Sequence, residues 1–168
     1  AESVTRLLEM GMDSVNFADA MLGVISQRLA KKLCPPCKTS HLASASELLE
    51  IAEEFTAVAS IEKKFHQKDH QQLVESWREQ YGDASGNVRL YTHAGCENCG
   101  NSGFRGRMGL HELIVTSPEI KRLIRNRADL PDIVMQSIKD GTKTLKQDGI
   151  EKVLLGETTL YQIRAACI

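Results

Sequence analysis

The sequence has few aromatic residues, few prolines and no long apolar run. Its 168 residues include 1 Trp, 3 Tyr, 4 Phe and 4 Pro. The longest uninterrupted apolar stretch, Ala20–Ile25, is far shorter than the roughly 18 residues that a membrane-spanning helix needs. Neither sign of charge is in excess, because 21 Lys and Arg stand against 22 Asp and Glu. These features exclude a collagen, a disordered tail and a membrane bundle, and the length suffices for one sizeable core or two small ones.

The short motifs of the common nucleotide-using, metal-dependent and serine enzymes are also missing. The sequence contains no G-x-x-x-x-G-K-[ST] phosphate loop, no G-x-G-x-x-G, no H-E-x-x-H and no G-x-S-x-G. The glycine-rich run Gly103–Gly109 has no Lys followed by Ser or Thr, so we expect it to form a tight turn. We therefore predict no catalytic residue and no nucleotide-binding residue in this chain.

Five cysteines are the unusual feature of the composition. Four of them form two C-x-x-C pairs, Cys34-Pro-Pro-Cys37 and Cys96-Glu-Asn-Cys99, and the odd total argues against a closed disulfide framework. Two such pairs can supply the four thiolates of a closed, tetrahedral structural zinc site. We predict that Cys34, Cys37, Cys96 and Cys99 bind zinc, and that Cys167 is a small core residue.

Other uses of the cysteines and histidines stay open. Cys34 and Cys37 could form a redox pair, although such a pair usually begins a helix, which two consecutive prolines do not favour. The four thiols could also be buried without any metal. Each of the five histidines could replace a cysteine ligand, but we expect solvated surface positions for all of them: His41, His66, His70, His93 and His111.

Basic residues flank both cysteine pairs. They are Arg28, Lys31, Lys32 and Lys38 around the first pair, beside Gln27, and Arg105 and Arg107 after the second. Zinc ribbons bind nucleic acid through such surroundings, so a zinc-ribbon nucleic-acid-binding module is the alternative function. Only Tyr91 and Phe104 are near enough in sequence to stack on bases, and acidic residues share the region. We therefore expect no nucleic-acid partner, and assign these cations to a subunit contact or a solvated face.

Apolar periodicity and capping signals predict an α+β, mostly helical chain. Expected helices start at Ser3, at Asn16, at Ser44 in a capping box with Glu47, near Asp69, after Ser117, at Asp129, at Thr144 and after Thr158. The helices at 44–58 and 69–81 read as a hairpin. Expected strands are Val88–Tyr91 and Met108–Val115, while Gly23–Leu33 suits a strand or a helix and the polar run Lys38–His41 reads as a break.

Several runs together resemble the type II secretion and type IV pilus-assembly motor ATPases. The runs are Val4–Met12, Leu22–Leu29 leading into the first cysteine pair, the second pair, Gly103–Leu113, Gly141–Leu145 and Gln147–Thr159. The resemblance covers nearly all of the chain outside an insertion at about 38–94. It favours strands for Val24–Leu33 and Met108–Val115, which would pair at the base of the zinc module.

The resemblance implies a hexameric, cytoplasmic ATPase with a RecA-like core that powers pilus assembly or protein secretion. In that family the phosphate loop and the catalytic acids precede the region where this chain begins, so ATP and magnesium would belong to the parent protein and the fragment alone would not be catalytic. Platform proteins of the machinery would hold the parent at the bacterial inner membrane. The cysteine module favours the assembly and secretion branches over the retraction motors.

The same resemblance divides the chain into four parts. Residues 1–33 would be the final part of the RecA-like core, and 34–106 the zinc module with its helical insertion at about 44–81. Residues 107–117 would form a strand returning to the core. The last part, 118–168, would be a C-terminal helical subdomain.

Overall fold

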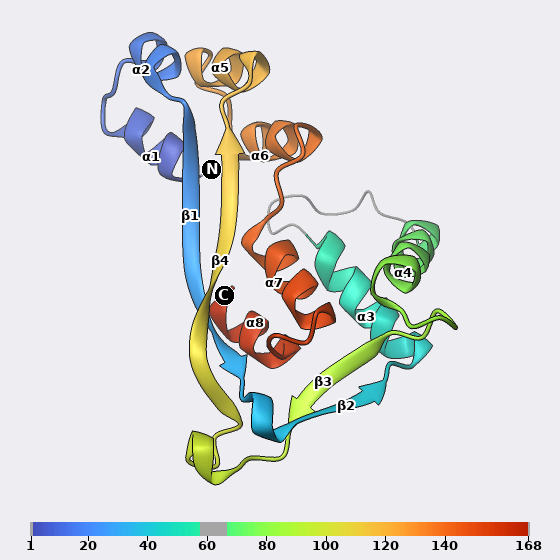
Figure 1. Cartoon of the computed structure of the whole chain (residues 1–168). Helices are drawn as coiled ribbons and strands as arrows, with labels where there is room; N and C mark the ends of the chain where they lie inside the picture. Colours follow the sequence, from blue (N-terminus) through green and yellow to red (C-terminus); the bar gives the residue numbers. More distant parts are fainter. Residues whose placement is uncertain (1, 58–66, 168) are drawn as a thin grey trace. The chain divides into compact units, whose positions relative to one another are not determined.

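The computed structural model describes residues 2–57 and 67–167 of the chain (Figure 1). Its elements are α1 (Glu2–Glu9), α2 (Ser14–Ala20), β1 (Gly23–Leu33), η1 (Pro35–Cys37), β2 (Lys38–Leu42), α3 (Ala45–Thr56), α4 (Gln67–Tyr81), β3 (Arg89–His93), η2 (Glu97–Cys99), β4 (Phe104–Val115), α5 (Pro118–Arg125), α6 (Leu130–Lys139), α7 (Leu145–Leu154) and α8 (Leu160–Ala166). The expected α+β class is confirmed. Within the described residues, none of the helices has the length and apolar character that crossing a bilayer demands.

Two compact units make up the described chain. The first contains the residues up to Ser26 and His111–Thr144, and the second contains the rest. Helices α5 and α6 belong to the first unit and α7 and α8 to the second, so these units do not follow the sequence-based limit at 118. The four-part division of the chain stays a prediction.

Strands β1 and β4 pair with each other, as the resemblance predicted. At one end Thr116 N–H donates to the Leu22 carbonyl over 3.1 Å, and at the other Cys34 N–H donates to the Gly103 carbonyl over 2.9 Å, so the pair is antiparallel. Strand β4 begins at Phe104, earlier than the expected Met108, because the backbone extends directly after the left-handed Gly103.

The first unit packs α1, α2, α5 and α6 around an apolar cluster. Its buried members are Val4, Leu8, Ala18, Met21, Ile120, Ile124 and Ile133. Helix α2 starts at Ser14, two residues before the expected Asn16, because the Asp13 carboxylate accepts the Asn16 N–H over 2.8 Å and caps the helix. Ala20, expected on the buried face, is exposed, and the buried residues of α2 are Ser14 and Ala18. Ser117 caps α5 in the expected way.

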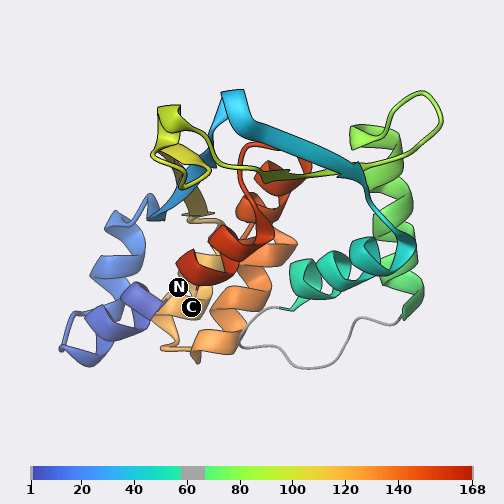
Figure 2. The ribbon, with the colours of Figure 1, turned by 90° about the horizontal axis from the view of Figure 1, so that it is seen from below.

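The second unit carries the expected helical hairpin, in which α3 packs against both α4 and α7 (Figure 2). The buried residues are Leu48, Ile51, Ala52, Val74, Trp77, Val88, Ile150 and Leu154. The ring of Phe55 meets that of Trp77 edge-on, with centroids 5.5 Å apart. The capping box of Ser44 and Glu47 is confirmed, and Val58, expected on the apolar stripe of α3, lies outside the described residues.

The polar run at Lys38 is a strand and not a break. Strand β2 pairs antiparallel with β3, from Lys38 opposite His93 to Leu42 opposite Arg89. All five side chains of β2 are exposed, so the strand has no apolar alternation by which the sequence could reveal it. Strand β3 runs to His93, two residues past the expected end at Tyr91.

A second cluster of this unit packs α7 and α8 against parts of β1 and β4. It contains Ala30, Met108, Leu110, Val153 and Ile163, and half-buried Cys167 packs against it in the role expected from the sequence. The cap of α8 is Thr159 and not Thr158. Thr158 is buried instead and bonds to the Lys31 carbonyl, which takes it out of the capping position.

Candidate metal centre

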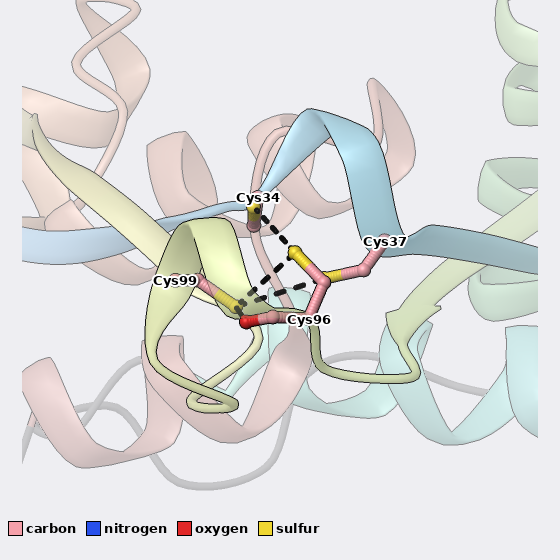
Figure 3. Close-up of side chains that lie close together, drawn as sticks. All are labelled: Cys34, Cys37, Cys96 and Cys99. Carbon is pink, nitrogen blue, oxygen red and sulfur yellow. Dashed lines mark hydrogen bonds between the residues drawn. The ribbon is translucent and has the colours of Figure 1, made fainter.

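The sulfur atoms of Cys34, Cys37, Cys96 and Cys99 converge on one point (Figure 3). The Sγ–Sγ distances are 3.8 Å for Cys34 and Cys96, 3.9 Å for Cys37 and Cys99, and 3.7 Å for Cys96 and Cys99. All four sulfurs lie within 4.8 Å of one another, and none is in a disulfide. A tetrahedral zinc ion with Zn–S bonds of about 2.3 Å places its sulfurs roughly 3.8 Å apart. The donor set therefore fits zinc in both chemistry and spacing.

The first cysteine pair sits on a tight turn at the end of β1. Pro35–Cys37 form η1, which is one turn of 3₁₀ helix. In this turn Cys37 N–H donates to the Cys34 carbonyl over 3.2 Å. The prolines lie at the start of this turn, where a missing N–H costs no hydrogen bond. Cys34 and Cys37 are both buried, so their sulfurs face away from solvent and toward the second pair.

The second cysteine pair forms a similar turn that glycines complete. Cys99 N–H donates to the Cys96 carbonyl over 3.2 Å, and Gly100 takes the left-handed conformation with φ 56°. Gly103 N–H then donates to Cys99 Sγ over 3.2 Å. Because backbone N–H donors stabilise a thiolate, this contact favours the charged form that a metal requires.

The β2–β3 ladder brings the two turns together. Cys34 and Cys96 are 62 positions apart in the sequence, but β2 leaves the first turn directly and β3 leads into the second. Ala94 N–H donates to the Cys37 carbonyl over 3.0 Å, which continues the ladder to the cysteines. The two ends of the insertion thus meet at the cysteines, and the helical hairpin lies at the far end of this stem (Figure 1).

Burial and hydrogen bonding act on the thiols in opposite directions. Burial raises the pKa of Cys34 to about 12 and also raises the pKa of Cys37. At Cys99 burial again favours the neutral thiol, but backbone hydrogen bonds to Cys96 and Gly103 prevail and lower the pKa to about 6. A redox pair needs a low-pKa attacking thiol at the start of a helix, so the high pKa of Cys34 in a 3₁₀ turn argues against the oxidoreductase alternative.

The histidines lie outside the sulfur cluster in the described part of the chain. His41 is exposed on β2, and its Nε2 is 2.9 Å from Glu47 Oε1. Solvated positions were expected for His70 and His93, and both expectations are wrong. His70 is half-buried with Nε2 2.8 Å from Thr56 Oγ1, and half-buried His93 packs edge-on against Phe104. His111 is exposed on β4, and His66 is outside the described residues.

Two of the basic residues near the cysteines, Lys32 and Lys38, make contacts within the second unit. Lys32 Nζ lies 3.8 Å from a Glu157 carboxylate oxygen. Lys38 Nζ donates to the Gly156 carbonyl over 2.7 Å and stands 4.2 Å above the centre of the Tyr91 ring. The remaining cations are exposed: Arg28, Lys31, Arg105 and Arg107. Since Tyr91 lies under Lys38 and Phe104 packs against His93, the two rings proposed for base stacking are already in contact with protein, which argues against the nucleic-acid alternative.

Sequence reasoning assigned no role to Lys38, Gly156 or Thr158 at this site. Lys38 was grouped with the cations around the first cysteine pair, Thr158 was placed before the last helix, and the run containing Gly156 and Thr158 was also part of the family resemblance. Their contacts join segments 118 or more positions apart, and no local spacing reveals such contacts.

Comparison with known proteins matches almost the entire chain. The family model described as type II/IV secretion system protein matches residues 1–165. Type IV pilus assembly ATPase PilB of Thermus thermophilus is 34% identical over 168 residues, which are 100% of this chain and 16% of that protein. PilB of Pseudomonas aeruginosa is 31% identical over 97% of this chain and 24% of its own length. Type II secretion system ATPase E of Vibrio cholerae serotype O1 is 30% identical over 96% of this chain and 26% of its own length. The chain thus spans between 16% and 26% of the length of these relatives.

Proposed function

Because the chain belongs to the type II/IV secretion system protein family, we propose that it is the zinc-bearing C-terminal region of a motor ATPase for type IV pilus assembly or type II protein secretion. The observation that carries this proposal is the convergence of four cysteine sulfurs in a chain whose relatives are ATPases of both machineries. The relatives' shared similarity across the whole chain supports a common role in the two machineries.

Cys34, Cys37, Cys96 and Cys99 would hold the zinc ion. Four thiolates leave no open position for water or substrate, so the ion is structural and joins the two turns. A structural zinc ion contributes folding free energy directly, about 10 kcal/mol or more in small modules.

The chain alone would be catalytically silent. No phosphate loop occurs in its 168 residues, and the chain covers 16% of the Thermus ATPase, so ATP and magnesium would bind elsewhere in the parent. Residues 1–33 and 107–117 would complete a RecA-like core. In the parent this core would assemble as a cytoplasmic hexamer that acts on inner-membrane platform proteins of the pilus or secretion machinery.

Metal analysis tests the zinc assignment. The reduced chain, purified without added metal, should contain one zinc ion per molecule, and a strong chelator should remove it with loss of near-ultraviolet circular dichroism. A well-folded, reduced sample that contains no zinc and is unchanged by chelator would refute the assignment.

An ATPase assay tests the silent-fragment proposal. The chain alone, mixed with magnesium and ATP, should release phosphate from ATP no faster than the same mixture without protein. The full-length parent protein, which contains the same residues, should hydrolyse ATP at a measurable rate. Hydrolysis by the isolated chain above background, proportional to its concentration and retained through purification, would contradict the proposal.

A further inference from the structure

The loop between α7 and α8 contacts both sides of the first cysteine pair. We name Gly156–Thr158 the clamp loop. It lies in the same compact unit as the four cysteines, and Figure 2 shows it beside the start of β2. Its contacts include Lys31 and Leu33, shortly before Cys34, and Lys38, directly after Cys37.

On the preceding side, the clamp loop binds the end of β1. The Glu157 carbonyl accepts the N–H of Leu33 over 2.8 Å, and the Thr158 hydroxyl donates to the Lys31 carbonyl over 2.7 Å. These two bonds act like a short strand pairing that fixes the backbone leading into Cys34. The Lys32 ammonium adds an exposed ion pair with Glu157.

On the following side, the clamp loop binds Lys38, which comes directly after Cys37. Lys38 Nζ donates to the Gly156 carbonyl over 2.7 Å while it stands over the Tyr91 ring. Gly156 lies so close to that ring that a Cβ would fall 2.5 Å from Tyr91 Cδ2, and its φ is 72°. The loop therefore fits this position only with glycine at 156.

Two of the three clamp-loop residues, Gly156 and Thr158, are buried, which makes their polar contacts costly to lose. Thr158 is fully buried, and its hydroxyl has the Lys31 carbonyl as its acceptor. A buried hydroxyl or carbonyl left without a partner costs more than the average hydrogen bond contributes. The clamp loop thus holds the backbone that leads into Cys34, at Lys31 and Leu33, and the side chain of Lys38 after Cys37.

We propose that Thr158 and Lys38 are positioning residues for the metal centre, and that metal binding is thermodynamically linked to docking of the clamp loop. This inference rests on the proposed zinc site. Groups that orient metal ligands typically change metal affinity 10–100-fold when they are removed. Linkage is reciprocal. If undocking of the clamp loop lowers metal affinity by some factor, removal of the metal lowers the docking equilibrium constant of the clamp loop by the same factor.

Zinc affinity of the whole chain, measured by competition with a chromophoric chelator, tests the linkage. Thr158→Val keeps the side-chain shape but removes the donor, and we expect zinc affinity to fall about 10-fold. Thr158→Ser restores the hydroxyl and should bind zinc like the unmodified chain. Lys38→Met, which keeps the apolar stem and removes the ammonium, should also weaken binding and provides the same test where Thr158→Val does not fold.

Thr159→Val is the matched control. Thr159 caps α8 by accepting the Gln162 N–H and makes no contact with the first cysteine pair among the described hydrogen bonds. This variant should lower the melting temperature equally with zinc and with chelator, because it changes the stability of the fold and not the native-state zinc affinity. Thr158→Val should lower the melting temperature more with zinc than with chelator.

Hydrogen exchange supplies a readout that is independent of affinity. The Leu33 amide, bonded to Glu157, should lose protection when zinc is removed from the unmodified chain, together with the amides of α8. An unmodified chain that binds no zinc overturns the proposed zinc site itself. Zinc binding with equal affinity in the unmodified chain, Thr158→Val and Lys38→Met overturns the clamp-loop proposal and leaves the zinc site standing.

Discussion

Gly103 lies directly against the ring of His93: a Cβ on Gly103 would fall 1.9 Å from His93 Nδ1. The ring has little freedom to move away, because it packs edge-on against Phe104 with centroids 4.8 Å apart. The Gly103 carbonyl also accepts the Cys34 N–H, and the Gly103 N–H donates to the sulfur of Cys99. A single residue without a side chain thus connects the two cysteine turns.

Gly103→Ala should destabilise the fold and the metal centre together. The left-handed backbone alone costs an alanine about 1–2 kcal/mol, and the collision with His93 adds about 1–3 kcal/mol as overpacking does. Gly106→Ala is the control, since Gly106 has a similar φ of 81° but nothing within 4 Å of its Cβ position. Urea unfolding should show the larger loss for Gly103→Ala, and equal losses for the two variants would contradict the role of His93.

Cys96→Ser should abolish tight zinc binding. It removes one of four thiolates, so we expect affinity to fall by more than the roughly 100-fold seen when supporting groups around a metal are removed. Cys167→Ser is the matched control, because Cys167 packs against the α7–α8 cluster and lies outside the sulfur cluster. Zinc measured after gel filtration should be absent from the first variant and stoichiometric in the second. The assignment of ligands fails where Cys167→Ser loses zinc and Cys96→Ser keeps it.

Acid should remove the capping box of α3. A backbone hydrogen bond from Ser44, followed by the contact with His41, lowers the pKa of Glu47 from its ordinary 4.5 to about 2. Because the pKa is lower in the folded state, the stabilisation is fully present above pH 4.5 and is lost as the pH falls toward about 2. The Glu47 side chain is 40% exposed, and solvent screens its charge, so the whole capping contribution is about 1 kcal/mol.

Glu47→Gln measures this contribution. The unmodified chain should be more stable than Glu47→Gln in urea at pH 7, and the difference should shrink toward zero near pH 2. Glu53→Gln, an exposed change on the same helix, should show a small difference at both pH values. If the difference in unfolding free energy between the unmodified chain and Glu47→Gln is the same at pH 7 and near pH 2, the carboxylate charge has no part in the cap.

Arg164 should stabilise the hairpin through a charge network. Its guanidinium bonds Glu50 over 2.6 Å and also bonds Glu54, whose side chain is only 18% exposed and which Lys146 approaches to 3.2 Å. We expect Arg164→Met to cost about 1 kcal/mol at low salt and clearly less at 1 M salt, where charges are screened within about 3 Å. Arg122→Met, which removes an exposed pair with Glu119, should cost under about 0.5 kcal/mol. A salt-independent loss at Arg164 would point to packing of its stem and not to charge.

Elements with local signals were predictable from the sequence. The capping box at Ser44, the cap at Ser117 and the C-x-x-C spacing each depend on residues close together in the chain. Such signals survive in any tertiary context because their partners are neighbours. The resemblance added the pairing of β1 with β4, which periodicity left open.

Features that depend on distant partners were not predictable. Strand β2 has no buried side, so only its hydrogen bonds to β3 identify it. Thr158 resembles a helix cap in the sequence, and only its bond to Lys31, 127 positions away, shows that its hydroxyl serves the cysteine turn. His93 was expected in solvent because nothing in its neighbourhood in the sequence indicates Phe104 or Gly103 as packing partners.

The β2–β3 ladder also changes the search that assembles the cysteine cluster during folding. Without the ladder, Cys96 must find Cys34 through the diffusion of a segment 62 positions long. Once Lys38 pairs with His93, only a few residues on either side remain to be ordered. The logarithmic dependence of loop closure on length makes that shorter search more favourable by about 2 kcal/mol. The ladder thus turns a long-range encounter into a local one, and changes of length beyond Leu42 and Arg89 leave the closure of the cluster nearly unaffected.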